Sequence, residues 1–275
     1  QLNYNYLGEA ITGESETKKR ISYYKKLLKN PSVNHISIKI SSIYSQLNIL
    51  SWETTSTYIT LRLKDLFQTA LKLSLQQKQP KTITLDMESY HELELTLSIF
   101  KTVLSDPKLI TYKAGIALQS YIPQSYPLLL DLIKWANTRV KKGGAPIKIR
   151  IVKGANLEME HVTASLNNWE QAPFKTKVET DANFKKLLLD SLLPEHAKAI
   201  ELGIGSHNTF DIAFALTLKH QYQLSNITFE LLDGMSNTMA QTLYQLEEPV
   251  LLYCPLTSLS HYDQAMAYLI RRIDE

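Results

Sequence analysis

Lys148 and Arg150 are the first residues in this chain that indicate chemistry, because they interrupt a run of isoleucines. Residues 147–156 read Ile-Lys-Ile-Arg-Ile-Val-Lys-Gly-Ala-Asn. Since side chains alternate between the two faces of a strand, the isoleucines point one way and the two cations the other. Such a β-branched run is typical of a strand buried on both faces in an α/β protein. An unpaired buried charge is costly, so Arg150 predicts an anionic or electron-rich group beside it.

The same strand ends in Lys153-Gly154-Ala155. Small residues at this point let backbone amides approach a ligand. The sequence therefore predicts a binding site at the carboxyl end of this strand.

In three other expected strands, aliphatic and polar residues alternate, so the aliphatic side chains point to one face and the polar side chains to the other. The polar positions are Ser37, Lys39 and Ser41 in 35–41, Thr84 and Asp86 in 82–88, and Gln119 in 114–121. These side chains form either a satisfied internal salt-bridge network or a polar ligand cavity at the carboxyl ends of the strands. We favour the cavity.

A second cluster lies near the end of the chain, where Tyr268, Arg271, Arg272 and Glu275 share an expected helix over 262–275. Their spacings of three and four place them on neighbouring faces of that helix. Adjacent arginines are commonly a solvated face. Over a barrel mouth, however, the pair would form a bidentate fork for a carboxylate, with Glu275 holding one arginine in place.

The seven histidines show no metal-ligand spacing such as H-E-x-x-H, so the sequence predicts no metal site. His207-Asn208 closes an expected strand and opens a helix, a pattern that marks a helix cap as often as a ligand site. Together with Ser206, this turn is also suited to a phosphate or a nucleotide edge.

Eight expected strands, each followed by a helix, account for almost the whole chain. The strands cover 3–10, 35–41, 82–88, 114–121, the segment from Ile147, 202–207, 227–232 and 250–254. In 275 residues this alternation predicts one (β/α)8 TIM-type barrel domain over residues 1–275, with the last helix over the barrel mouth. An open doubly wound sheet is the alternative, but the chain lacks its G-x-G-x-x-G turn. The abrupt start and end of the pattern lead us to expect a fragment of a longer protein.

The composition argues against a nucleic-acid-binding protein, a disulfide-linked or cysteine-metal protein, and a membrane-spanning chain. A net charge of +3 with interleaved acids and bases argues against a nucleic-acid-binding surface. The single cysteine, Cys254, excludes an intramolecular disulfide and a cysteine metal cluster, and fits a reducing cytoplasm. No apolar run reaches the length of a membrane span.

Five short motifs occur in the order and spacing of the flavin-dependent proline dehydrogenase family. They are Ile38-Lys39-Ile40-Ser41, Leu85-Asp86-Met87-Glu88, residues 150–155, Ser206-His207-Asn208 and residues 268–272. With Gln171-Ala172-Pro173 and Thr180-Asp181-Ala182-Asn183, the pattern over 7–275 looks closest to the proline dehydrogenase domain of bifunctional proline utilization A proteins.

The resemblance implies a distorted (β/α)8 barrel that binds FAD noncovalently. It implies oxidation of L-proline to Δ1-pyrroline-5-carboxylate by hydride transfer to flavin N5, the first step of proline catabolism to glutamate. It also implies a cytoplasmic protein with peripheral contact at the inner face of the membrane, a quinone as electron acceptor, and a fused pyrroline-5-carboxylate (glutamate semialdehyde) dehydrogenase domain in the full-length protein.

The resemblance further implies roles for individual residues. Arg150 would lie near flavin N5 and Gln119 at the isoalloxazine edge. The expected flavin contacts are Met87, Gln119, Arg150, Val152, Lys153, Gly154, Ala155, Ser206, His207 and Asn208. Lys39, Arg271 and Arg272 would bind the proline carboxylate, while Asp86, Tyr253, Tyr268 and Leu232 would shape the pocket. Of these, Lys39, Asp86 and Arg150 are the expected catalytic residues.

Two positions depart from the family pattern. Asn156 stands where many members have an aromatic residue, and the segment 229–235 is shorter than the common version. Two other functions remain as alternatives: a Schiff-base aldolase using Lys39 or Lys153, and a non-catalytic barrel kept for interactions. The intact set of charged site residues argues against the latter.

Overall fold

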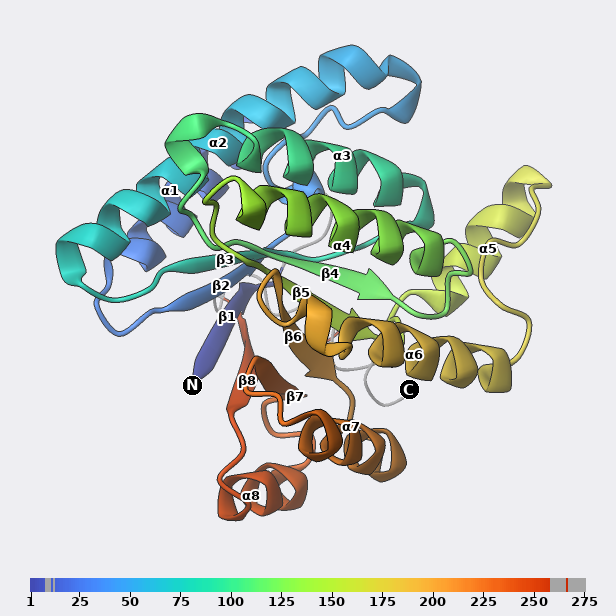
Figure 1. Ribbon diagram of the computed structural model, residues 1–275. Helices are drawn as coiled ribbons and strands as arrows, with labels where there is room; N and C mark the ends of the chain where they lie inside the picture. Colours follow the sequence, from blue (N-terminus) through green and yellow to red (C-terminus); the bar gives the residue numbers. More distant parts are fainter. Residues whose placement is uncertain (8–10, 12, 258–265, 267–275) are drawn as a thin grey trace. The chain divides into compact units, whose positions relative to one another are not determined.

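The computed structural model describes residues 1–7, 11, 13–257 and 266. Eight strands follow one another from β1 to β8 in the order of a closed barrel (Figure 1). They are β1 (Leu2–Tyr6), β2 (His35–Ile38), β3 (Thr82–Leu85), β4 (Gly115–Gln119), β5 (Ile147–Val152), β6 (Ile200–Gly205), β7 (Ile227–Leu232) and β8 (Val250–Leu256). With helices between successive strands, this order confirms the predicted (β/α)8 barrel class.

The helices alternate with these strands, and two of them lie between β5 and β6. They are α1 (Glu14–Lys29), α2 (Trp52–Gln77), α3 (Leu93–Leu104), α4 (Ser125–Lys141), α5 (Leu157–Asn167), α6 (Lys177–Ser191), α7 (Thr209–Tyr222) and α8 (Asn237–Gln245). Short 3-10 turns are η1 (Ile40–Ser42), η2 (Ile49–Ser51), η3 (Tyr90–Glu92), η4 (Pro107–Leu109) and η5 (Pro194–His196). In the described part of the chain, no helix is long and apolar enough to cross a membrane. The predicted final helix lies outside the described residues apart from Met266.

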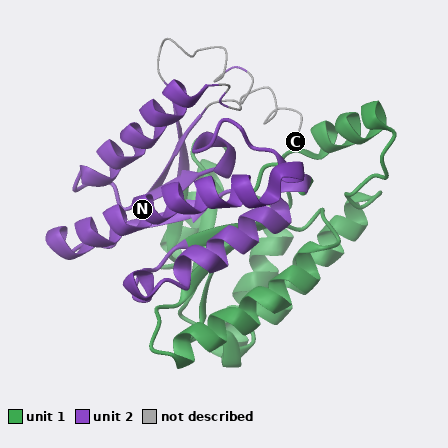
Figure 2. Ribbon diagram, turned by 90° about the horizontal axis from the view of Figure 1, so that it is seen from above, with its two compact units in different colours: residues 1, 87–90, 115–252 green, residues 2–86, 91–114, 253–275 purple. Residues whose placement is uncertain are grey.

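The contacts within the chain divide it into two units (Figure 2). Unit 1 comprises residues 1, 87–90 and 115–252, and therefore holds β4 to β7 and α4 to α8. Unit 2 comprises residues 2–86, 91–114 and 253–275, and holds β1 to β3 and α1 to α3. Lys39, Asp86 and Tyr253 belong to unit 2, and the other predicted site residues that the structure describes belong to unit 1.

Unit 2 is built from three parallel strands and the long helix α2. The register places Tyr4, Ile36 and Ile83 side by side. Helix α2 packs against α1 and α3. The 3.6-residue period predicts an apolar stripe on α2, and each of its members is fully buried: Ile59, Leu63, Leu66, Phe67 and Ala70.

In unit 1, strands β4 to β7 are parallel, and their register places several predicted site residues in rows across neighbouring strands. One row contains Ala117, Arg150 and Gly203. Two residues further along, the next row contains Gln119, Val152, Gly205 and Glu230. Because this second row includes the last residues of β4, β5 and β6, it marks the carboxyl edge of these strands.

Two strands of unit 2 end earlier than predicted. β2 stops at Ile38, because the carbonyl of Lys39 accepts hydrogen bonds from the amide of Ser42 at 3.1 Å and from its hydroxyl at 2.6 Å, which closes turn η1. Ser41 was expected on the polar face of a strand and lies instead in this turn. β3 ends at Leu85, so Asp86 follows the strand directly rather than lying within it.

Lys81 fixes the amino end of β3 within unit 2. Only 1% of its surface is exposed, and its ammonium donates to the carbonyls of Val33 at 2.6 Å and Asn30 at 2.8 Å. A third contact, to the carbonyl of Pro31, measures 3.4 Å. A buried charge is tolerated when its hydrogen bonds are made, and here the backbone between α1 and β2 makes them.

We predict that Lys81→Met lowers the free energy of unfolding by roughly 3 kcal/mol, because buried carbonyls lose a charged donor. Urea denaturation followed by circular dichroism measures the change. Lys72→Met, at an exposed position of α2, is the control and should stay within about 0.5 kcal/mol of wild type. Equal losses in the two variants would contradict the role of Lys81.

Candidate active site

The two cations of β5 meet a carboxylate from β7 inside unit 1. Glu230 lies 2.5 Å from the Lys148 ammonium through Oε1, and 3.5 Å from Arg150 Nη1 through Oε2. All three residues are buried. The salt-bridge network that we weighed against a ligand cavity therefore exists around these cations. Glu230 was not among the predicted site residues, although an acid within the apolar strand 227–232 was the available signal.

Gly203 and Ala117 leave room for this cluster. A Cβ atom on Gly203 would lie 2.2 Å from Glu230 Oε1 and 3.1 Å from Lys148 Cε. Both residues flank Arg150 in the strand register, so its neighbours on the same face are small. A guanidinium carries five N–H donors, and contact with Glu230 is compatible with a second contact to a ligand.

The turn after β5 is packed against an aromatic ring. Gly154 has φ +131°, and a Cβ there would lie 1.5 Å from Cδ1 of Tyr121. The amide of Tyr121 also donates to the carbonyl of Lys153 at 2.9 Å. Burial, with a smaller contribution from the charge of Glu160, raises the pKa of the Tyr121 phenol, so the phenol stays protonated at neutral pH. Close approach of Tyr121 is thus one reason for glycine at 154.

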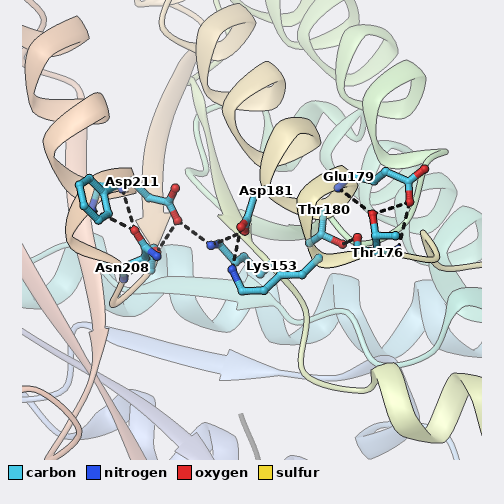
Figure 3. A network of polar contacts seen from close by, with 10 residues as sticks. Lys153, Thr176, Glu179, Thr180, Asp181, Asn208 and Asp211 are labelled. Atoms are coloured by element: carbon cyan, nitrogen blue, oxygen red, sulfur yellow. Dashed lines mark hydrogen bonds and ion pairs between the residues drawn. The ribbon is translucent and has the colours of Figure 1, made fainter.

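Lys153 joins helices α6 and α7 (Figure 3). Its ammonium lies 2.5 Å from Asp181 Oδ1 and 2.8 Å from Asp211 Oδ2. Lys177 contacts the other oxygen of Asp181 at 2.6 Å. Partial burial acts to lower the pKa of Lys153, but the two carboxylates outweigh it and the pKa is raised.

The charges of this cluster balance, with two lysines against two aspartates. Burial acts to raise the pKa of Asp181, but its hydrogen bonds to Lys153 and Lys177 prevail and the pKa is lowered. Lys153 therefore acts as an ionic cross-link between two helix starts. Asp181 and Asp211 were not predicted as site residues, because no local pattern ties them to Lys153.

The turn Ser206-His207-Asn208 caps α7. Asn208 Oδ1 accepts from the amides of Phe210 at 2.9 Å and Asp211 at 3.2 Å, so the helix-cap interpretation is confirmed. Ser206 donates to Asp211 Oδ2 at 3.2 Å and accepts from the Asn208 amide at 3.1 Å.

His207 and Leu232, which were predicted for different parts of the site, lie in contact. The Leu232 amide donates to His207 Nε2 at 3.0 Å. Since Nε2 accepts, the proton of a neutral ring resides on Nδ1. His207 thereby fixes the end of β7.

In unit 2, Asp86 and Tyr253 form a pair. The Tyr253 hydroxyl donates to Asp86 Oδ2 at 2.5 Å, and Asp86 is 8% exposed. The Asp86 amide donates to the carbonyl of Ile38 at 2.8 Å, which continues the β2–β3 ladder. Lys39 is half-buried one residue beyond Ile38.

The remaining predicted residues divide between described and undescribed parts of the chain. Met87 is buried and belongs to unit 1, as does Gln119, which is 4% exposed. Tyr268, Arg271, Arg272 and Glu275 lie outside the described residues. Within the described ranges, no group of three or more His, Cys, Asp and Glu side chains is placed to hold a metal ion.

The Asp181 carboxylate gives the stability of this unit an acid-side pH dependence. Since its folded pKa is lowered below the ordinary 3.8, its stabilising contribution is present above that value and is lost as the pH falls through the lowered pKa. We expect Asp181→Asn to be less stable than wild type at pH 6 and to lose less stability between about pH 4 and pH 2. Urea denaturation across this range measures how the free energy of unfolding changes with pH in each protein. The same pH dependence in both would contradict the role given to the Asp181 carboxylate.

Comparison with known proteins identifies the family of this chain. The family model described as proline dehydrogenase matches residues 1–275. Proline dehydrogenase 1 of Bacillus subtilis is 24% identical over 274 residues, which cover 98% of this chain and 76% of that protein. The bifunctional protein PutA of Rhizobium meliloti is 24% identical over 204 residues, or 70% of this chain and 15% of that protein.

Solved structures agree with this match. Proline utilization A from Corynebacterium freiburgense superposes with a TM-score of 0.94 at 39% identity, over 99% of this chain and 28% of that one. A proline utilization A from Bdellovibrio bacteriovorus, inactivated by N-propargylglycine, gives a TM-score of 0.87 at 25% identity, over 98% of this chain and 29% of that one. The chain thus spans less than a third of these two proteins. On the family match over its whole length, the chain belongs to the proline dehydrogenase family.

Proposed function

We propose that this chain oxidises L-proline to Δ1-pyrroline-5-carboxylate with FAD as cofactor, the first step of proline catabolism. The observation that carries the proposal is the buried Arg150, held beside Glu230 between two small neighbours in a proline dehydrogenase fold. When bound, FAD accepts the hydride that leaves the ring carbon next to the proline nitrogen. The protein supplies binding, orientation and electrostatics.

The residues of unit 1 are suited to a flavin. Gln119 brings a buried amide and Arg150 a buried guanidinium, on adjacent strands. The backbone of Val152–Ala155 begins at the last residue of β5. The Ser206-His207-Asn208 turn follows directly after β6, and both lie at the carboxyl edge, where barrel active sites lie. We assign the flavin contacts to these residues and to Met87.

The cluster around Lys153 suggests a positioning role for this residue. Its charge is balanced by Asp181 and Asp211, so it offers little net attraction to a pyrophosphate. We infer that Lys153 orders the starts of α6 and α7, and that the cofactor is held there mainly by backbone and neutral donors.

On the substrate side, we assign the proline carboxylate to Lys39, Arg271 and Arg272. Guanidinium groups match a carboxylate bidentately, which supports the assignment of the two arginines. Asp86, Tyr253, Tyr268 and Leu232 complete the proposed pocket, and Glu275 orients one arginine. The hydrogen bond between Tyr253 and Asp86 supports a shared role for that pair.

Kinship with bifunctional PutA proteins supports further proposals about partners. We propose a quinone as electron acceptor and a fused pyrroline-5-carboxylate dehydrogenase domain in the full-length protein. We also propose a cytoplasmic location with peripheral contact at the inner face of the membrane.

The Schiff-base aldolase alternative finds little support at Lys153. A Schiff-base lysine needs a neutral amine, which a lowered pKa provides. The two carboxylates instead raise the pKa of Lys153 and occupy its ammonium. Trapping by borohydride in the presence of a carbonyl substrate would reveal an aldolase lysine at position 39.

We predict that the purified protein binds FAD and that L-proline bleaches its visible absorbance under anaerobic conditions. Reduction of the isoalloxazine removes its visible absorbance band, so the reaction is read directly from the spectrum. D-proline is the control, because the same atoms in mirror arrangement cannot present both carboxylate and ring carbon to the site. A protein that stays unreduced by L-proline after loading with FAD would contradict the proposed function.

We predict that Arg150→Met slows flavin reduction at saturating proline by about 10²-fold, while proline binding changes little. A fixed positive charge stabilises the negative charge that develops on the flavin during reduction, and such a group acts on the rate more than on affinity. Stopped-flow spectroscopy measures the limiting rate and the dissociation constant separately. An unchanged limiting rate would remove Arg150 from the catalytic residues.

A further inference from the structure

The segment Met87–Tyr90 belongs to unit 1, and two side chains at the start of α5 hold its backbone. The side-chain amide of Asn156 donates to the carbonyl of Glu88 at 2.6 Å. The carboxylate of Glu160 accepts from the amide of Tyr90 at 2.6 Å. Both bonds end on main-chain atoms, so they fix the path of the segment whatever its side chains do.

The side chain of Asn156 contacts Glu88 and does not cap its own helix. Asn156 is the N-cap residue of α5, a position where asparagine usually accepts a hydrogen bond from its own helix. Here its side chain makes no cap hydrogen bond, and only its carbonyl starts the helix, by accepting from the Glu160 amide at 2.9 Å.

Glu160 is the second half of the same contact. It lies four residues after Asn156, on the same face of α5, and is 7% exposed. A buried carboxylate requires hydrogen-bond donors, and the Tyr90 amide supplies one. We call Asn156 and Glu160 the α5 clasp.

The α5 clasp lies next to two groups of proposed flavin contacts. Glu88 directly follows Met87, and Asn156 directly follows the Val152–Ala155 turn. The turn is itself fixed, because Gly154 is packed on Tyr121. The hydrogen bond between Asn156 and Glu88 is therefore anchored one residue from a proposed cofactor contact at both ends, and the bond between Glu160 and Tyr90 lies further along the same two segments.

We propose that Asn156 and Glu160 are positioning residues, which fix Met87 relative to the Val152–Ala155 turn and thereby set the geometry of the flavin site. This inference rests on the proposed function. Misplacement of reacting groups by about 1 Å can cost up to roughly 10²-fold in rate, so loss of the clasp should appear in the rate of flavin reduction.

Four variants test the α5 clasp. Glu160→Leu removes the acceptor, whereas Glu160→Gln keeps a carbonyl oxygen at the same place. Asn156→Asp removes the donor but remains a good N-cap residue, so α5 itself is not weakened. Glu158→Leu is the matched control, since Glu158 is an exposed acid in the same first turn.

Two measurements are made on the FAD-loaded protein. Hydrogen exchange should show the Tyr90 amide protected in wild type, Glu160→Gln and Glu158→Leu, and exchanging about ten-fold faster or more in Glu160→Leu. The limiting rate of flavin reduction by proline should fall about ten- to a hundred-fold in Glu160→Leu and Asn156→Asp. Glu160→Gln should restore it to near the wild-type rate.

Each outcome decides the proposal. Unchanged exchange at Tyr90 in Glu160→Leu would overturn the clasp. Faster exchange with an unchanged reduction rate would leave the clasp a structural feature only and overturn the positioning role. If Glu160→Leu does not fold, Asn156→Asp decides by the reduction rate. If proline fails to reduce the wild-type flavin, the proposed function and the positioning role are both rejected, while the exchange result still shows whether the clasp exists.

Discussion

Burial of two cations on one face of β5 is the constraint on which the rest of unit 1 depends. Lys148 and Arg150 are at most 6% exposed, and charges at such depth require a partner. Glu230 provides it from β7. Its carboxylate lies beside Gly203 of β6, so a side chain at position 203 would force this ionic contact to shift. One buried ionic contact thus constrains residues on three successive strands, β5, β6 and β7.

The connection after β5 carries a second set of constraints. Gly154 is packed on Tyr121, Lys153 cross-links two helix starts, and Asn156 reaches the backbone of Glu88. Four parts of unit 1 therefore contact three closely spaced residues, Lys153, Gly154 and Asn156. A binding site built on such a turn is held from several sides, and its geometry does not depend on one contact.

Features of the fold that depend on periodicity in the sequence were predicted from local patterns. The alternation of strands and helices led to the barrel, the 3.6-residue period led to the buried face of α2, and the isoleucine run identified the strand of Arg150. Asn208 was recognisable as a helix cap because capping is a contact between near neighbours. Strand ends were less predictable, since β2 gives way to a turn through hydrogen bonds of Ser42 to Lys39 that no alternation reveals.

Partners distant in the sequence were not predictable in the same way. Glu230 is separated from Arg150 by 80 positions, and their contact depends on the register of three strands. The contacts of Lys153 with Asp181 and Asp211 depend on where two helices start. Asn156 illustrates the limit most clearly, because its side-chain amide donates to the backbone of Glu88, 68 positions away in the sequence, and makes no cap hydrogen bond to its own helix.

The distances in the buried cluster also bear on how Arg150 serves the proposed reaction. Glu230 approaches Lys148 to 2.5 Å but Arg150 only to 3.5 Å. Coulomb attraction falls with distance, so the carboxylate is neutralised mainly by the lysine and offsets the guanidinium less. Glu230 therefore contacts Arg150 while its own charge is offset mainly by Lys148. A cation that is held in place before the reaction is the arrangement that stabilises negative charge appearing only in the transition state, because no reorganisation is needed when the charge develops.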